Sequence, residues 1–182
     1  MRLVATYPPF CPPATAQATV SPDRLVLDLF QAHGDGVFRL AMLLLGRPSD
    51  AEDIVQETFL RLLRHVAAGR PLPNARGWLH TVAAHACRDQ QRRTRRWLPW
   101  PASPDFHESP DRPDDADGME PITLALRKLP PRDRLLIALR ADGLSYSEIG
   151  VAAGVRGTSV GRLVARALDR LSRELDAFGV RP

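Results

Sequence analysis

The chain of 182 residues, 44% of them hydrophobic, is long enough for one ordinary domain or two small ones. Its longest uninterrupted apolar run covers residues 40 to 45, far too few to cross a bilayer, which argues against insertion in a membrane. Basic residues outnumber acidic ones by four, and all but one of the 25 are arginine. The planar guanidinium suits a phosphate-bearing partner, although a GC-rich genome would produce the same bias.

The first 21 residues are expected to form a disordered leader on a cytoplasmic protein. Prolines at positions 8, 9, 12 and 13 interrupt them, so no apolar stretch of secretory length remains. Cys11 in this leader and Cys87 further along are too few for a disulfide framework and lack CxxC spacing for zinc. Both are interpreted as ordinary thiols, with oxidant sensing as the alternative.

Residues 22 to 97 have the pattern of a helical block. Ser21-Pro22-Asp23 predicts a helix start, and the stretch from His33 to Gly36 predicts a kink or a break before a core helix over 37–45. Residues 49–52, Ser-Asp-Ala-Glu, have the form of a capping box and predict the start of the next helix. Helical spacing places its core face at Val55, Phe59, Leu62 and Val66.

The opposite face of that second helix is acidic, with one exposed leucine among its charges. It runs through Asp53, Glu57, Leu60 and Arg64. An ordinary solvated face is more often charged throughout, so Leu60 hints at a protein-docking surface. A plain solvated helix remains the alternative.

A loop over 67–75 contains two prolines and ends at Asn74, which can cap the helix that follows. In that helix the buried stripe is expected at Trp78, Leu79, Val82, Ala83 and Ala86. Its other face runs through Thr81, His85, Arg88, Arg92 and Arg95. Like charges at helical spacing repel each other by a few tenths of a kcal/mol per pair, so phosphate binding is favoured over a bare solvated face.

Residues 98–120 hold five prolines, seven carboxylates and one basic residue, a composition that predicts an unpacked linker. Beyond it, helices are expected at about 122–128 and from Pro130-Pro131 to Leu139, ending at Gly143. Ser145 and Glu148 form a second capping-box pattern before a short helix that reaches Ala153. A long basic helix over 159–177 follows, with a buried stripe expected at Val160, Val164, Ala167, Leu171 and Leu175. Short helix, glycine turn and long basic helix are typical of a helix-turn-helix that enters a major groove.

Four motifs in this order resemble the extracytoplasmic-function sigma factors, a compact class of bacterial transcription initiation factor. They are DAEDIVQETFLRL at 50–62, RGWLHTVAAHACRDQQRR at 76–93, LRKLPPRDRLLIALRADGLSYSEIG at 126–150, and the closing basic helix. The resemblance covers residues 22–176 and implies an all-α fold of two small helical domains, region 2 at 22–97 and region 4 at 121–178. The flexible acidic linker over 98–120 joins them.

The resemblance also implies roles for single residues. Asp53, Gln56, Glu57 and Leu60 are expected to dock on the clamp helices of the largest subunit of core RNA polymerase. The 67–77 loop and the next helix are expected to hold open the minus-ten promoter element, with one unpaired base flipped into a pocket beside the loop. The candidates nearest that strand are Arg76, His80, His85, Arg88, Arg92 and Arg93.

The helix-turn-helix is expected to read the minus-thirty-five element of promoter DNA, while region 4 contacts the flap of the second-largest polymerase subunit. Its candidate contacts are Arg156, Ser159, Arg162 and Arg166. Many relatives have Lys-Ser-Arg where this chain has Gly161-Arg162-Leu163, which removes basic side chains and lowers helix propensity. An anti-sigma factor is a further expected partner.

Two other classes of function compete with this interpretation. A helix-turn-helix regulator acting without polymerase usually dimerises to match two half-sites, and the sequence contains no heptad pattern for a dimer helix. A metal enzyme would have to use His80, His85 and Cys87, which have apolar neighbours and no fourth ligand. We therefore expect a binding factor with no cofactor and no metal, and not an enzyme.

Overall fold

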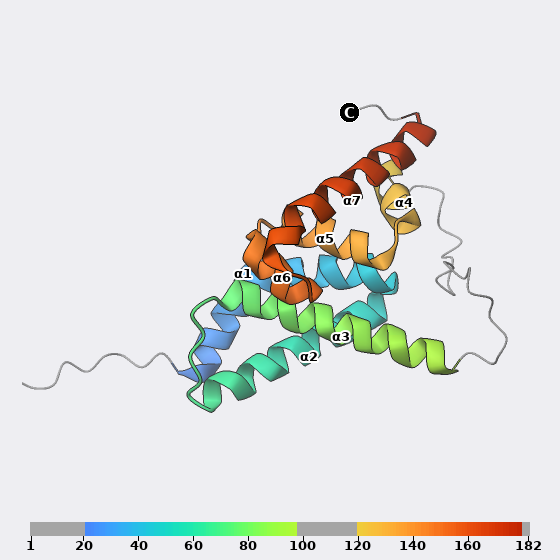
Figure 1. The fold of residues 1–182 in the computed structure, drawn as a ribbon. Helices are drawn as coiled ribbons and strands as arrows, with labels where there is room; N and C mark the ends of the chain where they lie inside the picture. Colours follow the sequence, from blue (N-terminus) through green and yellow to red (C-terminus); the bar gives the residue numbers. More distant parts are fainter. Residues whose placement is uncertain (1–20, 98–119, 180–182) are drawn as a thin grey trace, which may run out of the picture.

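The computed structural model describes residues 21–97 and 120–179, and every regular element within these ranges is a helix (Figure 1). The helices are α1 (Pro22–Leu45), α2 (Pro48–Ala67), α3 (Ala75–Trp97), α4 (Pro121–Lys128), α5 (Pro131–Ala141), α6 (Tyr146–Ala153) and α7 (Gly157–Ala177). The predicted all-α class is thus confirmed. The leader and the acidic linker lie outside the described residues.

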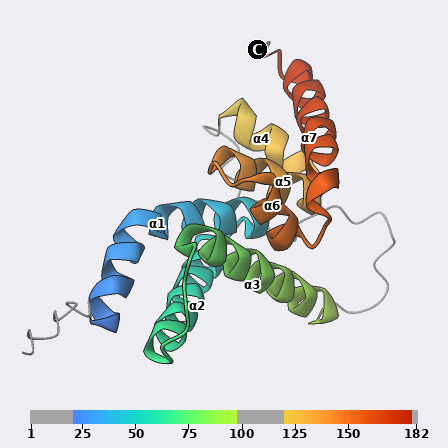
Figure 2. The same ribbon diagram turned by 60° about the vertical axis from the view of Figure 1, so that its left-hand side comes forward.

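Helix α1 begins and ends as its sequence predicts. The Ser21 hydroxyl accepts a hydrogen bond from the Arg24 amide at 3.3 Å, and Pro22 takes the first helical position. Gly46 ends the helix in the left-handed region, with φ of 81°. The stretch from His33 to Gly36 does not break the helix, which continues to Leu45, but Figure 2 shows that α1 is bent along its length.

The predicted start of α2 at a capping box is wrong. The helix begins at Pro48, one residue before Ser49, because proline at the first helical position already has the required φ. Its core face also differs from the prediction: Phe59 and Leu62 are buried, but Val55 and Val66 are only half buried. The other buried residues of α2 are Ala51, Ile54 and Thr58.

The C-terminal helices follow their local signals closely. Both hydrogen bonds of the predicted capping box at the start of α6 are present, between Ser145 and Glu148. Gly154 then ends α6 with φ of 68°, a conformation that residues with a Cβ rarely adopt. Helix α7 starts at Gly157, two residues before the predicted start, and buries Val160, Val164, Ala167 and Leu171 as expected. Leu175, which was expected in the same stripe, is half buried.

The two helical blocks pack against each other. Helices α5 and α6 lie on α1 and α3, and one hydrophobic cluster contains buried residues from all of them (Figures 1 and 2). This packing buries Ala84 and Cys87 of α3, which lie outside the predicted stripe. Trp78 and Val82, which the prediction placed in that stripe, are half buried. A separate small cluster joins α4 to the second half of α7 through Ala125, Leu129 and Leu171.

None of the described helices combines the length and the apolar character that a bilayer span would need.

Candidate protein and nucleic-acid interfaces

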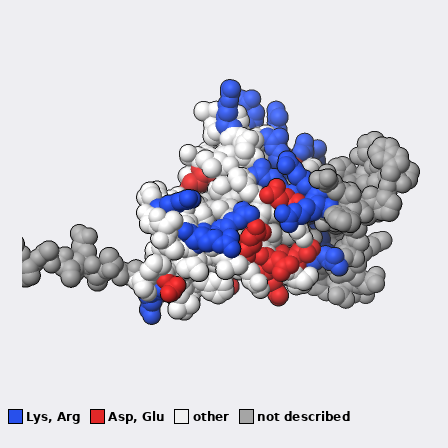
Figure 3. Space-filling model, turned by 90° about the horizontal axis from the view of Figure 1, so that it is seen from below, with Lys and Arg blue, Asp and Glu red and all other residues white. Residues whose placement is uncertain are grey.

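The predicted docking residues lie together on the outer face of α2. Asp53, Gln56, Glu57 and Leu60 are all exposed, and 52% of Leu60 is accessible to solvent. Glu57 accepts a hydrogen bond from Arg61 at 2.5 Å, one helical turn further on. Seen from below, where α2 lies, acidic side chains gather in one area with basic ones at its border (Figure 3). The face therefore offers charge and one apolar contact point to another molecule.

The six minus-ten candidates on α3 divide into two groups in the structure. His85, Arg92 and Arg93 are exposed and free to meet a ligand. Arg76 and Arg88 are half buried, and His80 is 2% exposed. The second group is covered by the turn between α5 and α6 and by α6 itself, a contact that the sequence did not predict.

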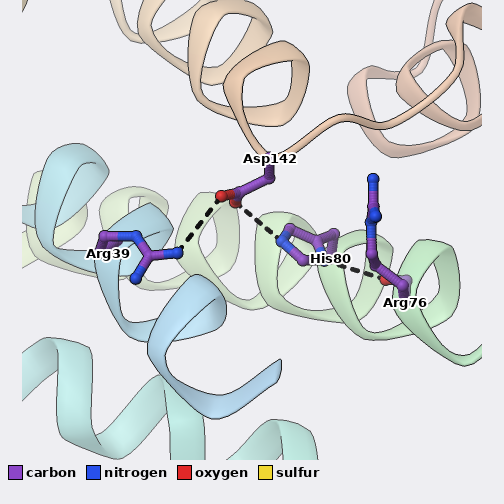
Figure 4. A network of polar contacts seen from close by, with 4 residues as sticks. All are labelled: Arg39, Arg76, His80 and Asp142. Atoms are coloured by element: carbon purple, nitrogen blue, oxygen red, sulfur yellow. Dashed lines mark hydrogen bonds and ion pairs between the residues drawn. The ribbon is translucent and has the colours of Figure 1, made fainter. Parts of the chain in front are cut away.

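His80 joins α3 to the end of α5 and, through Asp142, to α1 (Figure 4). Its Nδ1 lies 2.9 Å from the Arg76 carbonyl oxygen, and its Nε2 lies 2.9 Å from Oδ2 of Asp142. The other carboxylate oxygen of Asp142 lies 3.6 Å from Nη2 of Arg39. Both ring nitrogens of His80 face acceptors, so both hydrogen bonds form together only when each nitrogen carries a proton.

The carboxylate of Asp142 is stabilised in its ionised form by this network. Burial by itself would raise the pKa of Asp142. The hydrogen bond and the charge of His80, together with Arg39, outweigh that effect, so the pKa is lowered from its ordinary value. Asp142 is therefore an anion held against the basic side of α1 and α3.

Two further polar contacts hold α6 against α3. Asn74 donates from Nδ2 to Oε1 of Glu148, while its own Oδ1 caps α3 by accepting from the Gly77 amide at 2.9 Å. This confirms the predicted cap of α3. Arg88 donates from Nη2 to the Ala152 carbonyl at 2.8 Å, in the last turn of α6, where helix carbonyls carry partial negative charge.

We expect Glu148 to make the stability of the fold depend on pH in the acid range. Hydrogen bonds from Ser145 and Asn74 lower the pKa of Glu148 from 4.5 to about 2. A depressed pKa contributes stability above the unfolded value, and that contribution is lost as pH falls from about 4.5 through about 2. Thermal unfolding should therefore show wild type more stable than Glu148→Gln at pH 6, with the gap narrowing to about a quarter of that value by pH 2.5. Glu174→Gln, on α7, is the matched control, and an equally large closing gap there would contradict the assignment.

The surroundings of His85 and Cys87 on α3 favour the uncharged form of each side chain. Burial, and then the charge of Arg88, lower the pKa of His85, so its ring is neutral near pH 7. Burial raises the pKa of the Cys87 thiol to about 12, so the thiol stays protonated at neutral pH. Within residues 21–97 and 120–179, no three His, Cys, Asp or Glu side chains gather closely enough to hold a metal ion. Cys11 lies outside the described residues.

A basic hollow lies beside the 67–75 loop, where the family resemblance implied a pocket for an unpaired base but the sequence did not indicate the residues that line it. It has a volume of about 290 Å³ and is lined by Arg61, Arg64, His65, Arg70 and Trp78. The ring centroids of His65 and Trp78 are 5.0 Å apart, and Nε2 of His65 lies 3.1 Å from the Pro71 carbonyl oxygen, which ties the loop to α2. One sequence signal could have indicated this hollow: Arg61, Arg64 and His65 follow closely at the end of α2, and Trp78 lies near the start of α3. Aromatic and guanidinium groups together suit an unstacked base and its phosphate.

The helix-turn-helix candidates all lie at or near the start of α7. Arg156, Ser159, Arg162 and Arg166 are exposed, consistent with a face that could enter a groove. A Cβ at Gly161 would lie 3.3 Å from Cε2 of Tyr146, so a side chain there would require the exposed tyrosine ring to shift by a few tenths of an ångström.

Both halves of the chain match known family models. Residues 29–97 match Sigma-70 region 2, and residues 119–171 match Sigma-70, region 4. The chain is 33% identical to the ECF RNA polymerase sigma factor SigE of Mycolicibacterium smegmatis over 152 residues, which are 79% of this chain and 59% of SigE. It therefore spans less than two thirds of that relative. Identity to SigM of Mycobacterium tuberculosis is 31%, over 87% of this chain and 81% of SigM.

Solved structures share the fold. The sigma factor RpoE, in complex with the anti-sigma factor NepR from Bartonella quintana, superposes with a TM-score of 0.63 at 22% identity, covering 85% of this chain and 96% of that one. CnrH, in complex with the cytosolic domain of CnrY, has a TM-score of 0.63 at 24% identity, covering 89% and 94%. The helical arrangement is thus common to these proteins.

Proposed function

Because the chain belongs to the extracytoplasmic-function family of bacterial RNA polymerase sigma factors, we propose that it binds core polymerase and directs it to promoters. Residues 22–97 form the part that holds polymerase and the minus-ten element, and residues 121–178 form the part that reads the minus-thirty-five element. The protein works in the cytoplasm by binding, and carries out no catalysis of its own.

The observation that carries this proposal is that two neighbouring helices, α2 and α3, present exposed surfaces of opposite charge. The outer face of α2 presents Asp53, Glu57 and Leu60 to solvent, and α3 presents Arg92 and Arg93. An acidic face with an exposed leucine suits the clamp helices of the largest polymerase subunit. An arginine face suits a phosphate backbone. One small block can therefore bridge polymerase and DNA.

Promoter opening requires a surface that binds separated strands better than paired ones. Arginines along α3 neutralise phosphates of the unpaired strand, and the hollow beside the 67–75 loop receives an unstacked base. Each base or phosphate captured this way is an interaction that the closed duplex cannot make. The binding energy itself then favours the open state, and no covalent step is needed.

Helix α7 supplies the contact with intact duplex upstream. Its N-cap residue Arg156 and, in its first half, Ser159, Arg162 and Arg166 are exposed and would form the recognition helix of a helix-turn-helix. Region 4 also meets the flap of the second-largest subunit. Since Gly161 has no side chain, the basic contacts fall to the residues on either side of it.

Regulation by a protein partner belongs to the same proposal. RpoE and CnrH were solved in complex with NepR and with the cytosolic domain of CnrY. An anti-sigma factor of this kind would hold the present chain inactive by covering its polymerase and DNA surfaces.

The decisive experiment is to mix the full chain with purified bacterial core polymerase. We expect a one-to-one complex by native mass spectrometry and RNA synthesis from promoters found by sequencing the DNA that the complex retains. A helix-turn-helix regulator that works without polymerase would bind DNA alone and form no such complex. A core enzyme that remains unable to initiate RNA synthesis in the presence of the chain would refute the proposal.

A further inference from the structure

We propose that the end of α5, the α5–α6 turn and α6 form an internal cover on the basic side of α3, which nucleic acid must displace in order to bind. This inference rests on the proposed role of α3 in holding the minus-ten strand. The cover consists of Asp142, Glu148 and the Ala152 carbonyl, and we call these three groups the acidic cap.

The acidic cap meets α3 at the positions where phosphates would be held. Asp142 lies 2.9 Å from His80, and the Ala152 carbonyl accepts from Arg88 at 2.8 Å. Glu148 accepts from Asn74 at the start of α3. Two carboxylates and a helix C-terminal carbonyl thus present negative charge to a row of cationic and donor groups, as a nucleic-acid backbone would.

The cover is selective. It reaches the three minus-ten candidates Arg76, His80 and Arg88, and a Cβ added at Gly143 in the turn would lie 2.9 Å from Nη2 of Arg76. It leaves Arg92 and Arg93 at the far end of α3 exposed, together with Asp53 and Glu57 on α2. The chain can therefore meet polymerase and part of the DNA while the acidic cap is in place.

One buried residue in the interface between α5 and α1 favours opening of the cover. Arg134 of α5 is 9% exposed, and its Nη1 donates to the Leu43 carbonyl of α1 at 3.1 Å. Its Nε is buried and makes no hydrogen bond. Burial lowers the pKa of Arg134, which reflects the cost of keeping the charge there. A buried cation paired with a carbonyl alone opposes closure, because opening returns the guanidinium to water.

The test compares Asp142→Ala with Asp176→Ala in the full chain. Both changes remove one exposed or half-exposed carboxylate, but only the first breaks the contacts to His80 and Arg39. We expect Asp142→Ala to speed amide hydrogen exchange in the first half of α3 and at the α5–α6 turn. It should also tighten binding of a fluorescent random-sequence single-stranded 20-mer about fivefold, because a larger fraction of the protein is open. Asp176→Ala should do neither.

A second variant separates the cover from a simple charge effect. Arg39 is 67% exposed on α1 and touches the acidic cap through Asp142, so Arg39→Gln should not disturb folding. This change removes one positive charge from the protein, and that loss by itself weakens DNA binding. Loss of the cover has the opposite effect and strengthens DNA binding. We expect tighter binding of the 20-mer in this variant too, with the same change in hydrogen exchange.

Unchanged exchange in both variants would overturn the inference, because the contacts would then not hold the cover in place. Faster exchange with no gain in DNA affinity would overturn the inhibitory role. A triple variant, in which Arg92→Ala and Arg93→Ala are combined with Asp142→Ala, separates failure of this inference from failure of the proposed function. If that combination weakens binding of the 20-mer, α3 binds DNA and only the cover is refuted. If no variant or wild type binds DNA or activates polymerase, the proposed function has failed as well.

Discussion

Replacing Asp53 and Glu57 by lysine is expected to abolish binding to core polymerase while the helical fold stays intact. Both carboxylates lie on the exposed face of α2, outside the core. Reversing them turns two attractions to a basic partner surface into repulsions, which should weaken affinity about 100-fold or more. The lysine at position 57 also loses the pair with Arg61, a surface effect of a few tenths of a kcal/mol. Titration of labelled core polymerase measures the affinity, and circular dichroism reports the fold.

The matched control reverses Asp35 on α1 and Asp176 on α7, two exposed carboxylates away from the outer face of α2. This double variant has the same change in net charge. It should keep its affinity for polymerase within about twofold, since long-range effects of exposed charges are screened by salt. Equal losses in both double variants would mean that net charge alone governs binding, and the docking role of α2 would be withdrawn.

Truncation of Arg92 and Arg93 to alanine is expected to reduce promoter opening and to flatten its dependence on salt. These arginines are exposed and lie beyond the acidic cap, unlike Arg88, whose guanidinium also bonds to Ala152. Each phosphate contact to a single strand contributes about 0.7 to the slope of log K against log salt, so losing two should lower it by about 1.4. Permanganate footprinting of the polymerase complex over a salt series measures the extent of the open region.

Arg24→Ala with Lys128→Ala is the control for this experiment. It removes the same charge from exposed positions on α1 and α4, where each side chain pairs with a carboxylate. We expect a normal open region with an unchanged slope. If instead the two double variants have the same footprint and slope, α3 does not hold the separated strand through these arginines.

Much of the fold could be read from residues close together in the chain. Ser21 and Asn74 cap their helices, and Ser145 with Glu148 forms the capping box of α6, because each such signal acts within a single helical turn. The buried stripe of α7 follows from its spacing in the same way. Local signals failed at the start of α2, because the helix begins at Pro48 and Ser49 therefore lies inside it and does not cap it.

The candidate surfaces were only partly predictable. The acidic face of α2 and Arg92 of α3 follow from periodicity, and Arg93 follows from the family resemblance. The structure leaves Asp53, Glu57, Arg92 and Arg93 exposed. The periodicity of α3 does not predict that His80 is buried or that it contacts another helix. The hollow lined by Arg61, Arg64, His65, Arg70 and Trp78 combines the end of α2, a loop and the start of α3, so no single spacing reveals it.

The sequence by itself determined which segments are helical, the side-chain caps of α1, α3 and α6, and much of the charge that the helices carry on their outer faces. Only the tertiary structure decided which of those charges meet. His80 contacts Asp142 at a separation of 62 residues, and Arg88 contacts Ala152 at a separation of 64. Helix signals depend on interactions within a few residues, whereas these contacts depend on how α5 and α6 pack against α1 and α3, which no local pattern encodes.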